Sequence, residues 1–151
     1  MEVLISIRPK WCELIFSGRK TLELRKTIPK KITPPFKAYV YCTNSYERII
    51  TIGPDETIAN GTVCAEFICD YILRHCQMAN ADLAEQQSLV RRQDIYWHSG
   101  CGNNEVFGLH ISDLRIYDEP KPLKQFQIPT TFPARRIRQA PQSWCYVEEK
   151  S

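Results

Sequence analysis

The amino-acid sequence predicts an α+β fold that contains more strand than helix. Short runs rich in β-branched and aromatic residues, typical of strands, recur along the chain at 3–7, 38–43, 61–73, 106–109, 114–117 and 144–147. Helical spacing or composition is confined to the segment after Pro9 and to residues 81–92. With 151 residues and 43% hydrophobic content, the chain is expected to form a single domain over residues 1–151.

A short helix is predicted near the N-terminus. Pro9 suits the first turn of a helix, where a residue without an N–H is tolerated. Trp11, Leu14 and Ile15 recur at helical spacing and form one apolar face. Gly18 supplies the left-handed residue that commonly ends a helix. The helix therefore begins at Pro9, runs for about two turns and stops before Gly18.

A charged strand follows this helix immediately. From Thr21 the pattern has a period of two, so Leu22 and Leu24 point to one side of the strand. Thr21, Glu23 and Arg25 point to the other. We expect Leu22 and Leu24 to be buried, with the polar side chains on the opposite face.

Charge is unevenly distributed along the chain, although the net charge is only +3. Residues 1–31 contain eight Lys/Arg against three acidic residues, whereas residues 44–118 contain five Arg against eleven acidic residues. Residues 119–151 are again basic, with six Lys/Arg against three acidic residues. If the first and last strands meet in the fold, a basic face results, and such a face attracts phosphates. The alternative is that these cations only solvate the surface.

The cysteines and the first apolar segment bear on the compartment. The seven cysteines are an odd number, and Cys42, Cys64 and Cys69 lie inside predicted strands, which favours reduced thiols packed as small apolar groups. The first apolar stretch ends at Arg8, far short of the roughly 18 residues of a membrane-spanning helix. We therefore expect a cytoplasmic protein that makes no membrane contact.

Glu66 interrupts the apolar run 63–68. A carboxylate is costly to bury unless it is paired, so a cationic partner is expected nearby, and Lys20 or Arg25 would serve. Such a group could belong to a structural ion-pair network or to a ligand-binding or catalytic pocket. The sequence leaves both interpretations open.

Several aromatic residues lie near basic ones, as they do where single-stranded nucleic acids are bound. Trp11, Tyr39 and Tyr41 are expected to be packing residues, because most aromatic side chains in a domain of this size belong to the core. Trp144 follows a Pro-Gln turn and is the better candidate for contact with a base.

The sequence predicts no metal site and no cofactor. His75 and Cys76 are adjacent and cannot readily reach one tetrahedral ion together with His98 and Cys101, and the chain contains no Cys-x-x-Cys pair.

The order of these segments resembles a known family, the ASCH domain of the PUA-like superfamily. The resemblance is carried by "RPKWCELIFSGRKTLELRK", a Pro-rich loop, "AYVYCT" and "GTVCAEFICDYI", and later by "FGLHISDLRIYDEPKPLKQF" and "APQSWCYV". The family signature G-x-K-x-x-E-x-R is matched by Gly18, Lys20, Glu23 and Arg25. The resemblance implies a PUA-like mixed β-barrel of about five to seven strands flanked by short α-helices.

This resemblance implies binding of RNA or a nucleotide-like ligand in a basic cleft beside the signature. Phosphate would be contacted by five cations, Arg8, Lys10, Arg19, Lys20 and Arg25. Glu23 and Glu66 would accept hydrogen bonds from a base or ribose, and Trp144 would contact a base.

Two other classes of function stay open. Similar bacterial proteins hydrolyse the acetyl amide of acetylated cytidine with a lysine, a threonine three residues later and a distant glutamate. Lys20 matches that lysine, but Glu23 holds the threonine position. If the protein is an enzyme, either an amidohydrolase or a ribonuclease, Lys20, Glu23 and Glu66 are the candidate catalytic residues. The third class is a protein-interaction module in a transcription or translation assembly.

Overall fold

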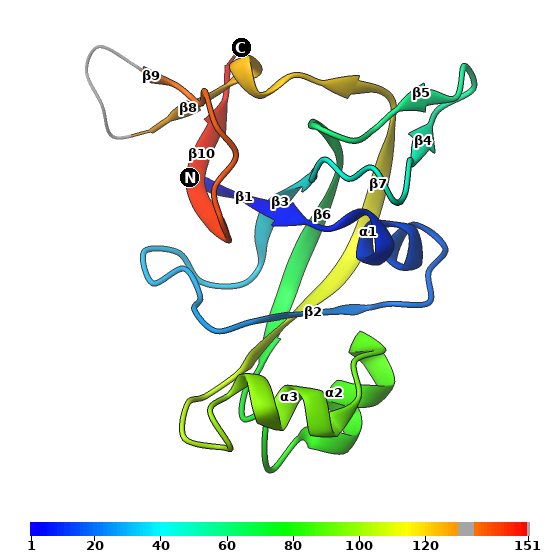
Figure 1. The fold of residues 1–151 in the computed structure, drawn as a ribbon. Coiled ribbons are helices and arrows are strands. Elements are labelled where there is room, and N and C mark those ends of the chain that lie inside the picture. The colour runs from blue at the N-terminus through cyan, green and yellow to red at the C-terminus, as the bar shows by residue number, and fades with distance from the viewer. Residues whose placement is uncertain (130–134, 151) are drawn as a thin grey trace.

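Eight strands form one mixed sheet in the order β2-β7-β6-β3-β1-β10-β8-β9 (Figure 1). The computed structural model describes residues 1–129 and 135–150. The sheet strands are β1 (Glu2–Ile7), β2 (Leu22–Arg25), β3 (Phe36–Cys42), β6 (Thr62–Leu73), β7 (Phe107–Lys121), β8 (Phe126–Ile128), β9 (Arg135–Arg136) and β10 (Trp144–Glu149). The remaining elements are the hairpin β4 (Thr51–Ile52) and β5 (Thr57–Ile58), the helices α1 (Pro9–Phe16), α2 (Ala81–Ser88) and α3 (Arg92–His98), and the 3-10 helix η1 (Leu123–Gln125). The predicted α+β class is confirmed.

The sheet is open where a closed barrel of five to seven strands was expected. Among the described residues no pairing joins the edge strands β2 and β9. Both edges are short, with four residues in β2 and two in β9. The additional strands β8 and β9 are too short to give a periodic signal in the sequence.

The two ends of the chain meet in this sheet. β1 pairs in parallel with β3 and antiparallel with β10. Residues 3–7 are all buried, and since successive side chains of a strand point to opposite faces, both faces of the sheet are covered at β1. The two basic terminal segments are thereby brought together, which is the condition under which a basic face was expected.

The corner between α1 and β2 forms as predicted. Pro9 opens α1, and Cys12 and Ile15 pack into the main core. Gly18 follows the helix with φ +79°. None of the described helices is long and apolar enough to cross a membrane.

Burial along β2 differs from the simple alternation that was predicted. Leu22 is fully buried, but Leu24 is only half-buried and Glu23 is buried. The reason is that β2 has covered surfaces on both sides: Leu22 lies in a small core with Ala84 and Ile95, whereas Glu23 is enclosed by charged neighbours.

A glycine in β7 lets β2 approach closely. Leu24 pairs with Gly108, and a Cβ on Gly108 would lie 2.6 Å from Leu22 Cδ2. We expect Gly108→Ala to lower the free energy of unfolding by about 1–3 kcal/mol, because the added methyl group overpacks a buried contact. Urea denaturation measures the change. A loss no larger than that of Glu119→Ala, a substitution at an exposed position of the same strand, would contradict this account.

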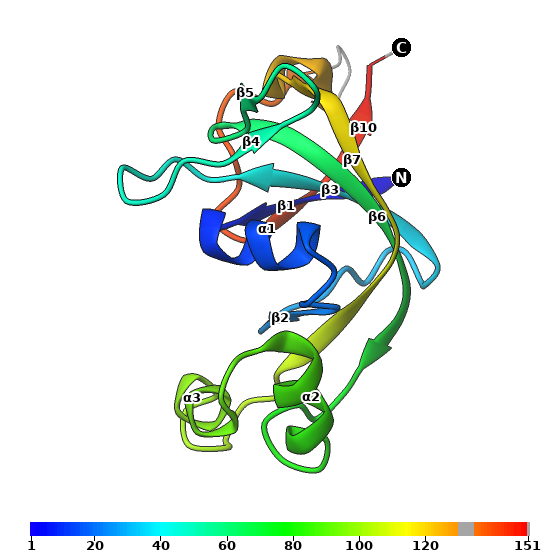
Figure 2. The same ribbon diagram turned by 90° about the vertical axis from the view of Figure 1, so that its right-hand side faces the viewer.

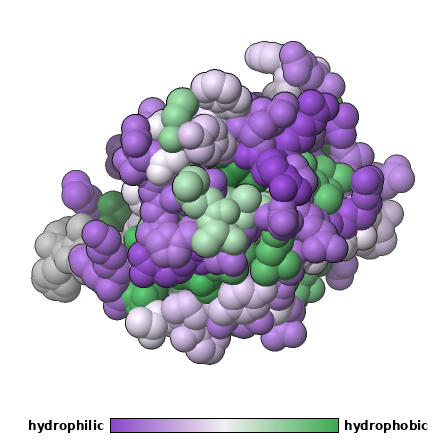
Figure 3. Space-filling view, turned by 90° about the horizontal axis from the view of Figure 1, so that it is seen from below, coloured by the Kyte–Doolittle hydropathy of each residue, from purple (hydrophilic) through white to green (hydrophobic). Residues whose placement is uncertain are grey.

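Residues 81–92 form two elements instead of the single helix that was predicted. Helix α2 ends at Leu89, whose left-handed φ of 63° stops it, and α3 begins at Arg92. Leu83 and Leu89 are exposed, while Val90 is partly buried against the small core of Leu22, Ala84 and Ile95. The two helices form a layer beyond β2 (Figures 1 and 2). On the face that carries them, hydrophobic side chains gather in the middle of a hydrophilic surround (Figure 3).

Two further strand predictions need correction. Residues 107–109 and 114–117 belong to one long strand, β7, which also contains Pro120, whereas Val106 precedes it. The pairing of β7 with β6 is irregular near Pro120, between Val63 and Ala65, so a residue without an N–H is tolerated there. The cysteines are free thiols, and the three expected in strands are buried in β3 and β6.

Candidate functional site

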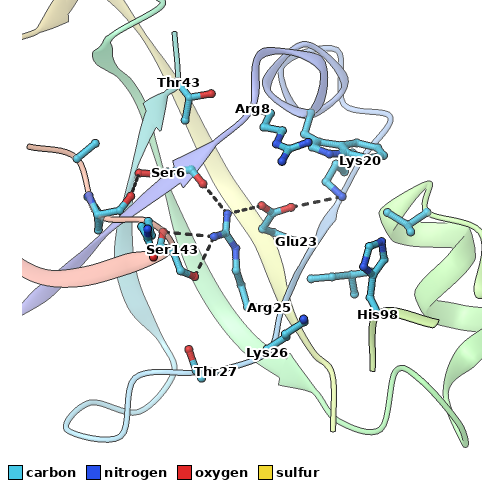
Figure 4. A pocket seen from close by; sticks show the side chains of 16 residues that line it. Ser6, Arg8, Lys20, Glu23, Arg25, Lys26, Thr27, Thr43, His98 and Ser143 are labelled. Carbon is cyan, nitrogen blue, oxygen red and sulfur yellow. Dashed lines mark hydrogen bonds and ion pairs between the residues drawn. The ribbon is translucent and has the colours of Figure 1, made fainter. Parts of the chain in front are cut away.

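A cleft of about 860 Å³ opens beside β2. Segments that are far apart in the sequence contribute to it, namely the end of β1, α1, β2, the α2–α3 region and the chain before β10 (Figure 4). The lining residues are Ser6, Arg8, Trp11, Lys20, Glu23, Leu24, Arg25, Lys26, Thr27, Thr43, Val90, His98, Ala140, Pro141, Gln142 and Ser143.

Glu23 lies at the centre of a buried charge cluster, which we call the Glu23 triad and which also contains Lys20 and Arg25. One carboxylate oxygen of Glu23 is 2.8 Å from Arg25 Nη2, and the other is 3.5 Å from Lys20 Nζ. Figure 4 shows the carboxylate between the two cations. The charged side chains of residues 20–25 are therefore brought into contact with one another.

Lys20 is almost fully enclosed, with 2% of its surface exposed. Its Nζ donates a hydrogen bond to the Ser88 carbonyl at 2.8 Å and lies 4.5 Å from the centre of the Trp11 ring. Burial lowers the pKa of Lys20, and the nearby Glu23 opposes that shift. Lys20 thus contacts Glu23 on its buried side and links the segment just before β2 to the end of α2.

Arg25 connects β2 to both ends of the chain. Its Nη2 donates to the Ser6 carbonyl at 2.7 Å, and its Nη1 donates to Ser143 Oγ at 3.0 Å. Ser6 Oγ in turn donates to the Pro141 carbonyl at 2.6 Å. Arg25 therefore fixes the segment before β10 as one wall of the cleft, while its own Nε is buried without a hydrogen-bond partner in the structure.

The cleft is cationic. Arg8, Lys20, Arg25 and Lys26 line it, against the single carboxylate of Glu23. Within residues 1–129 and 135–150, Arg8 and Lys26 form no ion pair, and both side chains are exposed. These two cations are available to an anionic ligand, whereas Lys20 and Arg25 are held by Glu23.

An apolar extension adjoins the cleft. A cavity of about 260 Å³ shares Trp11, Leu24, Val90 and His98 with it and reaches the buried Ile95 and Val106. A flat ring or another apolar group could lie there while a charged part of the same ligand contacts Arg8 or Lys26.

The structure brings together only part of the predicted site. Arg8, Lys20, Glu23 and Arg25 line the cleft. Lys10, Arg19, Glu66 and Trp144 do not.

The expected pairing of Glu66 with Lys20 or Arg25 is wrong. Glu66 Oε2 lies 3.2 Å from Lys37 Nζ, and Tyr117 donates a hydrogen bond to Oε1 at 3.0 Å. Strand β7 separates β6 from β2, and Glu66 is opposite Tyr39 and Arg115 in the strand register. Glu66 therefore belongs to a separate polar network and has no place in the cleft.

The burial of the aromatic residues agrees only in part with the prediction. Tyr39 and Tyr41 are buried, as predicted, but Trp11 is half-buried and lines the cleft. Trp144 is half-buried, donates a hydrogen bond from Nε1 to Thr27 Oγ1 at 3.0 Å and packs against Tyr146. Its contact with a base stays a prediction.

Several lining residues were not found from the sequence. Lys26 directly continues the charged run and could have been included, whereas Thr43, Val90, His98 and Gln142 carry no local signal. Of the residues considered for zinc, His98 lines the cleft, His75 lies beside Glu105 and Cys76 is buried in the small core. Within the described residues no cluster of His, Cys, Asp or Glu has an arrangement that could hold a metal ion.

Solved structures with a similar fold exist. ASCH from Zymomonas mobilis superposes with a TM-score of 0.68 and 19% sequence identity, over 97% of this chain and 87% of that chain. Two point mutants of that protein give TM-scores of 0.67 and 0.68, also at 19% identity and 97% of this chain, with 90% and 88% of their own lengths covered.

No family model matches the sequence, and no curated protein matches it significantly. The structural likeness extends over nearly the whole chain. The resemblance to ASCH inferred from the sequence is thus confirmed at the level of the fold. The chain has the fold of the ASCH domain.

Proposed function

We propose that this protein binds RNA or a nucleotide-like ligand in the cationic cleft. The observation that carries the proposal is the excess of four cations over one carboxylate around a cleft of about 860 Å³, with Arg8 and Lys26 exposed toward solvent. Phosphates are attracted to such a cluster, and cavities of this size commonly hold small ligands.

The roles of the individual residues follow from their surroundings. Arg8 and Lys26 contact phosphate, because neither is committed to a carboxylate. Trp11 and the apolar extension receive a base. The hydroxyl groups of Thr27 and Thr43 and the amide of Gln142 offer hydrogen bonds to a base or ribose.

The Glu23 triad acts mainly as the frame of this site. Lys20 is enclosed and bonded to Ser88, and Glu23 is bonded to Arg25. A hydrolytic role would require one of these groups to leave its partners and activate water or substrate. Binding without turnover is therefore the function that the arrangement supports best.

The cleft cations give a direct test. We expect Arg8→Ala and Lys26→Ala each to weaken binding of a short single-stranded RNA by about fivefold to tenfold. Each substitution should also make the slope of log affinity against log salt less steep by about 0.7, the value for one phosphate contact in a single strand. Fluorescence anisotropy at several salt concentrations measures both quantities, with single-stranded DNA and modified nucleosides as comparison ligands.

Arg115→Ala is the matched control, because Arg115 is an exposed arginine on β7 that does not line the cleft. Equal losses in all three variants would argue for non-specific charge attraction and against the cleft. Mass spectrometry of the bound RNA separates binding from catalysis, since a cleaved or deacylated product would identify a hydrolase. If the wild type binds none of these ligands, the proposal fails and a protein-interaction module becomes the better interpretation.

A further inference from the structure

A second cationic cavity adjoins the cleft. It has a volume of about 590 Å³ and is lined by Arg8, Pro9, Lys10, Thr43, Asn44, Ser45, Glu47 and Arg48. Arg8 and Thr43 also line the cleft, so the two cavities meet at these side chains. We call this second cavity the loop pocket, because five of its eight residues come from the loop between β3 and β4.

The loop pocket repeats the charge character of the cleft. Arg8, Lys10 and Arg48 line it, against the carboxylate of Glu47. Arg48 is paired with the exposed Glu13, yet a guanidinium has five N–H donors and can contact a second anion. The cationic surface therefore continues from Lys26, past Arg8, to Arg48.

An exposed aromatic residue lies in the same loop. Tyr46 is fully exposed, and Figure 2 shows the loop between β3 and β4 projecting from the body of the protein. The base of the loop is fixed by Asn60, whose Oδ1 accepts a hydrogen bond from the Ile50 N–H and whose Nδ2 donates to the Arg48 carbonyl. A large aromatic side chain is thus exposed to solvent in the same loop as Arg48, and exposed aromatic residues combined with cations are how single-stranded nucleic acids are bound.

We propose that the ligand is a single-stranded RNA chain and that the loop pocket binds a second nucleotide of it. This inference rests on the proposed function of the cleft and specifies its ligand. One nucleotide occupies the cleft, and the chain passes Arg8. The next phosphate lies against Lys10 and Arg48, and a neighbouring base stacks on Tyr46. A protein that binds only free mononucleotides would need the cleft but not the loop pocket.

Ligands of different length test this inference. Uridine monophosphate and oligouridylates of two to six nucleotides would be titrated against the intact protein at several salt concentrations. The expected result is tighter binding and a steeper salt dependence for the oligonucleotides than for the mononucleotide. Each additional phosphate contact should steepen the slope of log affinity against log salt by about 0.7.

Two variants place the effect in the loop pocket. Tyr46→Ala should weaken oligonucleotide binding by at least about fivefold, the loss of one stacked base, and should leave mononucleotide binding unchanged. Arg48→Ala should lower the salt slope for oligonucleotides only. Tyr71→Ala and Arg115→Ala are matched controls, because both residues are exposed and neither lines a cavity at α1.

The outcomes separate this inference from the proposed function. Equal affinity and equal salt slope for mononucleotide and oligonucleotides would overturn the second subsite while leaving the cleft intact. If both loop variants still prefer oligonucleotides to the mononucleotide, the second nucleotide does not bind in the loop pocket. If neither kind of ligand binds, the proposed function itself fails and this inference falls with it.

Discussion

Replacing Glu23 by alanine is expected to lower the free energy of unfolding by about 3–5 kcal/mol. Glu23 is the only acidic residue within ion-pair distance of Lys20 and Arg25 among the described residues. Its removal leaves two cations without a counter-charge, and one of them, Lys20, is 2% exposed. A buried charge that loses its partner retains the full cost of desolvation. Urea denaturation of wild type and variant measures the loss.

Two further variants make this prediction specific. Lys20→Met should cost less than Glu23→Ala, because Glu23 keeps Arg25 as its partner at 2.8 Å. Glu13→Ala should cost less than about 1 kcal/mol, because its pair with Arg48 is exposed. If Glu23→Ala proves no more harmful than Glu13→Ala, the triad does not hold the cleft together.

The stability of the fold is expected to fall steeply above pH 9. Burial raises the pKa of Cys69 and of Cys76 from 9.0 to about 12. Between these pH values the unfolded chain releases a thiol proton that the folded protein retains. The contribution of each thiol to the free energy of unfolding is therefore fully present below pH 9 and is lost as the pH rises toward 12. Each thiol lowers the free energy of unfolding by about 1.4 kcal/mol per pH unit in that window.

Other buried groups act in the same range. Burial, followed by the hydrogen bonds donated to Glu2 and Glu66, raises the pKa of Tyr39 and Tyr117, which adds to the loss above pH 10. The lowered pKa of Lys20 acts in the opposite direction, because the folded protein loses that proton first and stability then increases with pH. The pKa of Cys42, lowered by a hydrogen bond with Cys12, acts in the same direction as that of Lys20. These two groups do not offset the four whose pKa is raised, so the net effect is a loss.

Denaturation midpoints measured from pH 7 to 11 under reducing conditions test this expectation. The double variant Cys69→Ala and Cys76→Ala should show a flatter pH dependence than the wild type above pH 9. The single variant Cys101→Ala is the control, because Cys101 is exposed. An unchanged dependence in the double variant would show that the two thiols do not carry the effect.

Sequence and structure agree best at the corner between α1 and β2. Pro9, the apolar spacing of the helix and Gly18 are local signals, and they determined where α1 begins and ends. The charged strand after them was also correctly located. The division of residues 81–92 into two helices was missed, because the left-handed Leu89 has no glycine or asparagine to mark it.

The sequence by itself determined the α+β class, the corner between α1 and β2 and the fact that basic residues gather at the two ends of the chain. Only the tertiary structure decided which of those charges share a site. Arg25 bonds to Ser143, 118 residues away, and Glu66 bonds to Lys37 and Tyr117 instead of Lys20. The physical reason is that helix caps and strand periodicity act over a few residues, whereas the partner of a buried charge is set by strand order and register.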